Sequence, residues 1–447
     1  MLFDSPPKNW QVSTLGEICQ EGGGDIQTGP FGSQLHASDY VISGIPSIMP
    51  ANIKEGRVSE GGIARITEAD AKRLSKYLTK AGDIVYSRRG DVERCALIRK
   101  HEEGWLCGTG CLRVRPGSGV VDPDFCSHFL SHPETKEWIS RHAVGATMPN
   151  LNTQILSALP VLLPSLQEQK QIAHILGTLD DRIELNRKTN ETLESMAKAL
   201  FKSWFVDFDP VRAKAEVRPT GLPAEISDLF PDSLEDSELG EIPSGWRVAQ
   251  VGERLETVLG GTPLRKRSDY WGGDIPWIGS GMVNEFRVTR PTESITELGL
   301  AESATKLLPI RSTLIAITGA TLGQVSTNEI EVCANQSVVA ILPSSDFGAE
   351  YVHLWILSNI DILVSSQTGG AQQHVNKNNV NELPLLVPSL ATLARFSAST
   401  KPLYDKIAIN IFSSELLQNI RDSLLPKLIS GEIRIPDAEK MLEEVGV

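Results

Sequence analysis

The stretch that decides the fold is residues 159–204, LPVLLPSLQEQKQIAHILGTLDDRIELNRKTNETLESMAKALFKSW. It opens with a short apolar run between two prolines, which is typical of a buried strand ending near Pro164. A long helix is expected to follow, about 40 residues or roughly 60 Å long. Its apolar, small or asparagine residues recur at alternating spacings of four and three, which is the heptad pattern of a helix that packs against a partner helix. These positions are Ile172, Leu176, Leu179, Ile183, Asn186, Asn190, Leu193, Ala197, Leu200 and Trp204.

The same arrangement returns near the end of the chain. Leu383-Pro384-Leu-Leu-Val-Pro388 repeats the strand, and a second heptad helix follows it at an unchanged offset. The seam residues of this helix are Phe396, Thr400, Leu403, Ile407, Asn410, Ser414, Leu417, Arg421, Leu424 and Leu428.

The segments that precede the two helices are also repeated. WQVSTLGE at 10–17 matches WRVAQVGE at 246–253. Ile45–Ile48 matches Ile275–Ile278, and Asp83–Val85 matches Thr313–Ile315. The offset in residue number is the same for these two matches. It is smaller than the offset between the two tryptophan segments and larger than the offset between the two helices. Because loops tolerate insertions, a drifting offset indicates duplication of one fold. We expect an α+β protein, with two similar mixed α/β domains separated by a long antiparallel two-helix coiled coil of pseudo-two-fold symmetry.

The expected boundaries follow from this repeat. Residues 1–164 form the first globular domain and 165–206 the first helix; 242–388 form the second globular domain and 389–432 the second helix. Residues 433–447 form a C-terminal tail. Residues 207–241 contain 10 acidic and 3 basic side chains among several prolines, which predicts a mostly irregular acidic linker.

Polar residues lie in the middle of both heptad seams. If the helices pack antiparallel, Asn190 meets Asn410 and Asn186 meets Ser414, so that a matched polar layer forms at the centre. Buried asparagine at a seam position fixes register and orientation at some cost in stability. The alternative is that each asparagine points to solvent or to a third helix.

The composition is that of a soluble folded protein of two or three domains. No apolar run is long enough to span a bilayer and no secretory leader is recognisable, so we expect a cytoplasmic protein without membrane contact. The six cysteines fit buried free thiols better than a zinc site at Cys107 and Cys111. The net charge of −13 argues against nucleic-acid binding if taken alone, but residues 65–115 carry 12 basic and 7 acidic side chains, which leaves a local basic face for phosphates.

Four further segments, taken in order and twice over, carry a family resemblance: GGTPLRKRSDYWGGDIPW at 260–277, TMPNLN at 147–152, LPSLQEQKQI at 163–172 and LPKLISG at 425–431. With them nearly the whole chain resembles the DNA-specificity subunit of type I restriction-modification systems. The second copy departs from the pattern at 391–396, where ATLARF replaces the glutamine-rich helix start.

The resemblance implies two target-recognition domains, each reading one half of a bipartite, asymmetric target in double-stranded DNA. It implies that the helices dock two methylation subunits, which bind S-adenosylmethionine and modify adenine, and that restriction subunits join the full complex. This chain is expected to hold no cofactor itself.

Candidate DNA contacts lie on loops, because base reading needs side chains that reach out from a rigid scaffold. Arg88, Arg89 and Arg94 follow an expected strand and supply guanidinium groups for guanine; alternatively they lie in a solvated loop or pair with Asp91 or Glu93. Asparagine and glutamine can read adenine or cap local backbone. The further candidates of the first domain are Thr28, Ser33, Thr147, Asn150 and Asn152.

The second domain carries unlike candidates at comparable positions. Arg265, Lys266 and Arg267 are expected at phosphates or in an exposed charged turn, and Tyr270, Trp271 and Trp277 in the core or as a platform. The loop that corresponds to 88–94 has no basic residue, as two readers of different sequences require. The further candidates here are Thr318, Gln324, Gln372, Gln373, Asn376 and Lys377.

A catalytic role for the chain alone finds no support in motifs. The sequence has no phosphate-binding Gly-x-x-x-x-Gly-Lys-[Ser/Thr] loop, no Asn-Pro-Pro-Tyr or Asp-Pro-Pro-Tyr tetrapeptide of an adenine methyltransferase and no clear metal-nuclease cluster. We therefore expect a non-catalytic protein without a metal site. A coiled-coil scaffold that never touches DNA is the alternative, although it gives no reason for the two domains to carry different loops.

Overall fold

The computed structural model describes residues 7, 9–54, 56–145, 148–366 and 374–444. The chain divides into two compact units, one formed by residues 1–184 with 415–447 and the other by 185–414. The two longest helices, α6 (Leu166–Phe205) and α13 (Leu390–Ile429), each contribute to both units. Their bounds lie within one to three residues of the two helices expected from the heptads.

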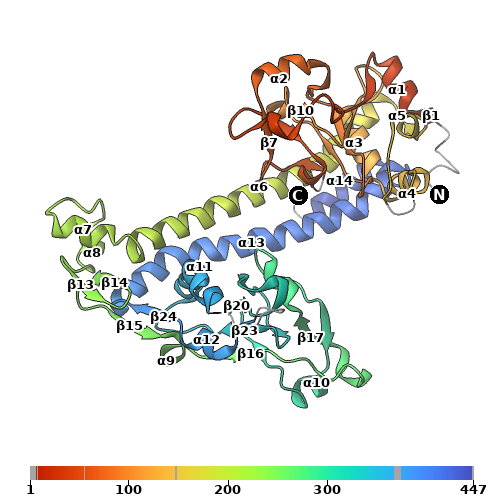
Figure 1. The fold of residues 1–447 in the computed structure, drawn as a ribbon. Helices are drawn as coiled ribbons and strands as arrows, with labels where there is room; N and C mark the ends of the chain where they lie inside the picture. Colours follow the sequence, from red (N-terminus) through yellow and green to blue (C-terminus); the bar gives the residue numbers. More distant parts are fainter. Residues whose placement is uncertain (1–6, 8, 55, 146–147, 367–373, 445–447) are drawn as a thin grey trace. The chain divides into compact units, whose positions relative to one another are not determined.

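The first unit contains two four-stranded sheets. One has the strand order β2-β11-β8-β9, with β2 Asp25–Thr28, β11 Cys111–Arg115, β8 Ile84–Ser87 and β9 Cys95–Leu97. The other has the order β10-β4-β7-β3, with β10 Leu106–Cys107, β4 Ile45–Ile48, β7 Ala64–Ile66 and β3 Tyr40–Val41. Two short pairs accompany them, β1 (Gln11–Thr14) with β12 (Pro160–Leu163) and β5 (Ile53–Lys54) with β6 (Arg57–Val58). The helices are α1 (Leu15–Glu21), α2 (Glu68–Arg73), α3 (Pro123–Ser131), α4 (Pro133–His142), α5 (Thr153–Ser157) and α14 (Ile435–Glu444), as Figure 1 shows.

The second unit repeats the first sheet and three strands of the second, but the fourth strand of its second sheet lies at the opposite edge, beside β22 (Val332–Ala334), the counterpart of β10. Its first sheet, β16-β23-β20-β21, has the same order, with β16 Thr257–Leu259, β23 Val338–Ile341, β20 Thr313–Ala316 and β21 Val325–Thr327. Its second sheet is β18-β17-β22-β19, with β18 Glu293–Ile295, β17 Trp271–Ile278 and β19 Leu307–Leu308. β15 (Arg247–Gln250) pairs with β24 (Pro384–Val387), as β1 pairs with β12. The helices are α9 (Val251–Arg254), α10 (Glu297–Ala301), α11 (Ala349–Ser365) and α12 (Lys377–Asn381).

The sheet registers correct one detail of the repeat. Tyr86 and Ile315 each occupy the third position of their strands and face the main core of their own unit, so these two residues correspond. The expected match of Asp83–Val85 with Thr313–Ile315, which pairs Val85 with Ile315, is therefore wrong by one residue. Both strands are buried at all four positions, so the alternation of apolar and polar residues that fixes register was missing from the sequence.

Each unit has one main core that joins the globular part to its helix segments. In the first unit, Phe125 and Phe129 of α3 share a buried cluster with Ile172 and Leu176 of α6 and Leu424 of α13. In the second, Phe201, Trp204 and Phe205 of α6 pack with Tyr351 of α11 and Phe396 of α13 at ring-centroid distances of 4.9–6.1 Å. Since each buried aromatic side chain contributes about 2 kcal/mol, the domain and its helix segments are stabilised as one body in each unit.

Residues 207–241 differ from the irregular linker that we expected. They contain α7 (Asp209–Ala215), α8 (Ala224–Ser227) and most of a hairpin of β13 (Leu234–Ser237) and β14 (Gly240–Pro243). Phe208, Val211, Ile226 and Phe230 are buried in the main core of the second unit. The acidic residues and prolines of this segment suggested an irregular linker. The segment folds because the apolar residues between them are buried in the core of the second unit.

Candidate nucleic-acid interface

Three loops of the first unit meet beyond the end of strand β8. Arg88 donates its backbone N–H to Gly110 O at 2.8 Å and accepts one from Leu151 N at 2.9 Å. Arg89 forms an antiparallel bridge with Asn150. The backbone therefore fixes the loop that starts at Arg88 both to the segment before α5 and to the turn between β10 and β11.

The predicted residues of the glycine-rich loop after β2 lie beside this group. Thr28 is the last residue of β2 and pairs with Leu112, whereas exposed Ser33 follows in the loop. The guanidinium carbon of Arg88 lies 5.9 Å from the centre of the Phe31 ring, so the loop after β2 and the loop after β8 share one surface.

The arginines of this surface differ in their exposure and in whether an acidic side chain already pairs with them. Arg94 Nε donates to Asp91 Oδ2 at 2.5 Å, which is the local ion pair that we considered as the alternative to DNA contact. Arg89 is exposed. Within the described residues, Arg88 Nε and Asn150 Oδ1 are buried without a hydrogen-bond partner. Buried polar atoms are nearly always satisfied by protein groups or ordered water, so these two atoms are exceptions among the side chains of this surface.

Two predicted asparagines have structural roles. Asn152 is the N-cap of α5, and its Oδ1 accepts the backbone N–H of Ile155 at 2.8 Å. Asn376, its counterpart in the second copy, caps α12 in the same way by accepting from Asn379 N at 3.1 Å. For both, the geometry is that of the backbone-capping alternative rather than base reading. Thr147, Gln372 and Gln373 lie outside the described residues.

The loops of the second unit meet at the corresponding place. Thr318 bridges His374, and Val375 N donates to Ile317 O at 3.0 Å. Gln324 N donates to Thr321 O at 3.0 Å, while its side-chain Oε1 is buried without a partner in the described part of the chain. Lys377, the first residue of α12, is half-buried.

The basic triplet of this unit is partly committed to internal partners. The Arg265 guanidinium stacks 3.7 Å from the centre of the Trp271 ring and pairs with Glu293 at 2.5 Å. Arg267 donates two hydrogen bonds to Asp269, at 2.8 and 2.6 Å. Lys266 is exposed. To bind a phosphate, Arg265 would therefore have to leave Glu293, and Arg267 would have to leave Asp269.

Tyr270 and Trp277 are buried and Trp271 is half-buried. The rings of Trp271 and Trp277 meet edge to face at 5.3 Å. Arg265 lies over the rings of Trp271 and Trp277, and Arg267 lies over the ring of Tyr270.

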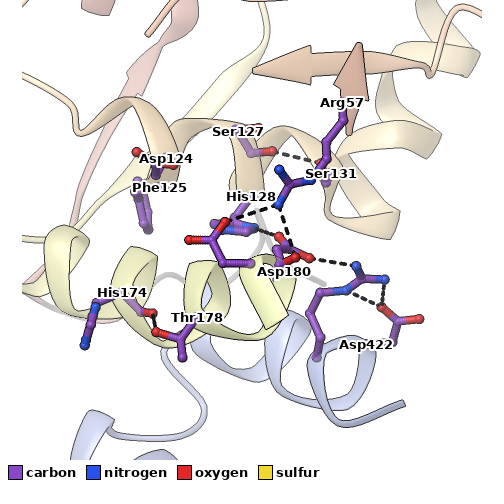
Figure 2. A network of polar contacts seen from close by, with 12 residues as sticks. Arg57, Asp124, Phe125, Ser127, His128, Ser131, His174, Thr178, Asp180 and Asp422 are labelled. Atoms are coloured by element: carbon purple, nitrogen blue, oxygen red, sulfur yellow. Dashed lines mark hydrogen bonds and ion pairs between the residues drawn. The ribbon is translucent and has the colours of Figure 1, made fainter. Parts of the chain in front are cut away.

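In each unit, one arginine that was not predicted from the sequence connects the globular domain to the helix segments of that unit. In the first unit, Arg57 reaches α6, where its guanidinium donates to Asp180 O at 3.1 Å and to Asp181 Oδ1 at 3.3 Å (Figure 2). Arg421 of α13 donates to Asp180 Oδ1 at 2.8 Å. Buried His128 lies 3.9 Å from Asp180, and its burial lowers its pKa below the usual range.

The equivalent anchor in the second unit is more deeply buried. Arg287, whose side chain is 1% exposed, lies 3.8 Å from Glu194 of α6 and 3.7 Å from Glu329. Arg311 pairs with Glu329 at 2.7 Å and with Asp405 of α13 at 3.3 Å. Burial raises the pKa of Glu329 although both arginines act to lower it. Arg57 and Arg287 are separated by the same offset as Ile45 and Ile275, so the repeat was the signal that could have revealed them.

The helix residues chosen from the heptads lie in contact within the second unit. Asn410 Nδ2 donates to Asn190 Oδ1 at 2.8 Å, and both side chains are buried. Asn186 Nδ2 donates to Ser414 Oγ at 3.2 Å. Because the partner number falls from 414 to 410 as the α6 number rises from 186 to 190, the helix segments of this unit run antiparallel.

Other kinds of site have little support. All six cysteines are buried free thiols, as the sequence predicts, and burial raises the pKa of Cys107 to about 12. No three histidine, cysteine, aspartate or glutamate side chains of the described residues gather in a way that could hold a metal ion. No helix of the described segments is long and apolar enough to cross a membrane.

Comparison with known proteins agrees with this architecture. The family model for the type I restriction modification DNA specificity domain matches residues 7–195 and 243–410. The chain is 29% identical over 410 residues to the type I restriction enzyme HindI specificity subunit of Haemophilus influenzae, covering 81% of this chain and 89% of that protein. It is 26% identical to the MjaIX specificity subunit of Methanocaldococcus jannaschii, covering 96% and 95%.

Among solved structures, the chain superposes on the type I restriction-modification S subunit from M. genitalium with a TM-score of 0.58 at 18% identity, covering 96% of this chain and 97% of that one. This likeness concerns the fold. Two matches of the family model, which together span most of the chain, coincide with the two copies of the repeat. The chain belongs to the family of type I restriction-modification specificity subunits.

Proposed function

We propose that each globular domain reads one half of a bipartite, asymmetric DNA target, and that the loops beyond β8 and β20 carry the reading residues. The observation that carries this proposal is the convergence of three loops at the same edge of the same sheet in both units. The scaffold repeats closely, but the side chains on it do not: Arg88 and Arg89 stand on one copy, and Thr318 and Gln324 on the other. Loops that vary on a constant frame suit two readers of unlike sequences.

The chemistry of the two surfaces supports different base preferences. Arginine forms two hydrogen bonds with guanine, and glutamine or asparagine forms two with adenine. Arg88 with Asn150 in the first unit, and Gln324 in the second, hold buried polar atoms without partners among the described residues. Exposed Arg89 and Lys266 supply charge for phosphates, which positions a reader without specifying sequence.

The helices are proposed to dock two methylation subunits that bind S-adenosylmethionine. Met196, Ile409 and Phe412 expose apolar surface on the helix segments of the second unit, although a lone soluble helix pair would favour polar residues there. Restriction subunits would join this assembly. This chain would bind no cofactor and catalyse no reaction itself, and the cytoplasm is its proposed location.

We further propose that α6 and α13 form one antiparallel coiled coil with pseudo-two-fold symmetry. Asn190 bonds to Asn410 in the second unit, and Asp180 pairs with Arg421 in the first. Between these two contacts the residue number on α13 falls by about as much as the number on α6 rises, as a single antiparallel register requires. A protein with such symmetry can present two readers to one face of a duplex, whose own two-fold axes lie perpendicular to its length.

The alternative is a scaffold that binds partner proteins and not DNA. A gel-shift experiment with duplex DNA, performed on the chain alone and with its methylation subunits, separates the two. The proposal predicts salt-sensitive binding that the methylation subunits strengthen. Absence of binding in both forms would favour the scaffold, and adenine methylation by the isolated chain would overturn the non-catalytic role.

A further inference from the structure

Each unit exposes one large apolar side chain on the loop that follows its first sheet strand. Phe31 is 55% exposed and Leu264 is 61% exposed. A glycine begins each loop, and the two glycines are held alike: Gly29 N donates to Cys111 O and Gly260 N to Val338 O, both at 2.9 Å.

These glycines leave no room for a side chain. A Cβ atom on Gly29 would lie 2.1 Å from Gly108 O, and one on Gly260 would lie 2.1 Å from Asn335 O. Such distances are far below van der Waals contact, so both loops are pressed against the neighbouring turn of the sheet. The start of each loop is therefore fixed by backbone packing.

The two apolar residues then open the same kind of turn. Phe31 O accepts Gln34 N at 2.8 Å, and Leu264 O accepts Arg267 N at 3.0 Å, three residues on in both cases. The equivalence is not visible in the sequence, because the second loop is longer by two residues between the glycine and the apolar side chain.

The turn of the first unit is also fixed from the far side. Gln34 Oε1 accepts Phe31 N at 3.2 Å and the hydroxyl of Tyr77 at 2.8 Å, and Arg73 donates to Gln34 O at 2.7 Å. The next residue, Leu35, is buried. The Phe31 ring thus projects from an ordered loop, which holds it outward at the cost of exposing apolar surface.

Cationic side chains stand beside both apolar tips. Arg88 lies over the Phe31 ring, and exposed Val144 and Met148 flank the segment that bridges Arg89. Leu264 directly precedes Arg265 and Lys266. An isolated exposed leucine or phenylalanine needs no explanation. The same exposed turn after the corresponding strand of both copies does need one, and in the first unit Arg88 places that turn beside the proposed DNA-reading loop.

We propose that Phe31 and Leu264 are apolar wedges, each of which enters between two adjacent base pairs of its own half-site and partly unstacks them. This rests on the proposed function, since it requires duplex DNA at these loops. Phenylalanine and leucine are among the side chains that DNA-bending proteins insert at base steps. A wedge adds sequence preference, because pyrimidine–purine steps unstack most easily.

The test uses the complex of this chain with its methylation subunits, and duplexes that carry the target mapped by adenine methylation. 2-Aminopurine replaces single bases through each half-site outside the methylated adenine, and its fluorescence rises when it unstacks. We expect a rise at one step per half-site. Phe31→Ala should abolish it in the first half only and Leu264→Ala in the second only, each with roughly tenfold weaker binding. Phe31→Leu should retain most of both effects.

Val217→Ala, which removes an almost fully exposed valine of the 207–241 segment, is the matched control and should change neither signal. Thermal melting and co-elution with the methylation subunits confirm that each variant is folded. If the wild-type complex does not bind the duplex, the proposed function fails and the wedges with it. If it binds tightly but no base unstacks, or Phe31→Ala leaves fluorescence and affinity unchanged, the wedges are refuted while the reading function stands.

Discussion

Replacing Asn410 by alanine probes the polar contact between the helix segments of the second unit. Asn410 is 2% exposed and Asn190 is 6% exposed, and the bond between them spans 2.8 Å. Truncation leaves the Asn190 carbonyl oxygen buried without its donor. A stranded buried polar group costs about 1–3 kcal/mol, so we expect Asn410→Ala to lower the local unfolding free energy by about 2 kcal/mol.

The double variant carries the sharper expectation. Asn190→Leu with Asn410→Leu removes both amides and refills the space with apolar atoms, which is nearly neutral or stabilising. Each single leucine variant leaves one amide facing a hydrocarbon. The two substitutions should therefore be strongly non-additive, with a coupling free energy of at least about 1.5 kcal/mol.

Hydrogen exchange of peptides covering residues 404–414 measures the opening free energy of this part of α13. Ser413→Ala, an exposed position on the same helix, is the matched control and should change it by less than about 0.5 kcal/mol. Additive single effects, or an Asn410→Ala change no larger than the control, would refute the buried pairing.

Three other perturbations test further contacts. Arg311 has a left-handed φ of 68°, so Arg311→Gly should be less destabilising in urea than Arg311→Ala by about 1 kcal/mol, although both variants lose the ion pair to Glu329; equal effects would mean that the backbone is unstrained. Burial lowers the pKa of His353 well below its usual value, so unfolding takes up a proton below about pH 6.5, and stability present at pH 7.5 should fall by about 1.4 kcal/mol at pH 5.5. His353→Gln should remove that part of the pH dependence, and an unchanged urea-midpoint profile would contradict the assignment. Asn152→Ala should lower the melting temperature through loss of a helix cap worth about 1 kcal/mol, yet leave DNA affinity in a filter-binding assay unchanged; weaker DNA binding would restore its role as a reader.

The helices and the repeat were open to prediction because their signals are periodic. The heptad spacing predicts both long helices nearly to the residue, and it also predicts the contact between Asn190 and Asn410. Paired motifs such as Trp10 and Trp246, both buried, marked equivalent positions in the two copies. A period survives changes of individual side chains, so one sequence is enough to detect it.

The remaining features depend on contacts that leave no local pattern. Asn152 and Asn376 looked the same as base-reading residues, because a cap and a reader use the same amide group. The folding of 207–241 depends on scattered positions such as Phe208 and Phe230, which acquire meaning only against a distant core. Arg57 and Arg287 share the repeat offset, but only the fold shows that each of them contacts the helix segments of its own unit.

The central claim is that each domain reads its own half of the target, and adenine-methylation mapping tests it most directly. The chain is co-expressed with its methylation subunits, and modified adenines are mapped by long-read sequencing for the wild type and for an Arg88→Ala, Arg89→Ala double variant. We predict a gapped, asymmetric motif for the wild type, and loss of specificity in only one half for the variant. A continuous palindrome, or a variant that relaxes both halves equally, would contradict the account.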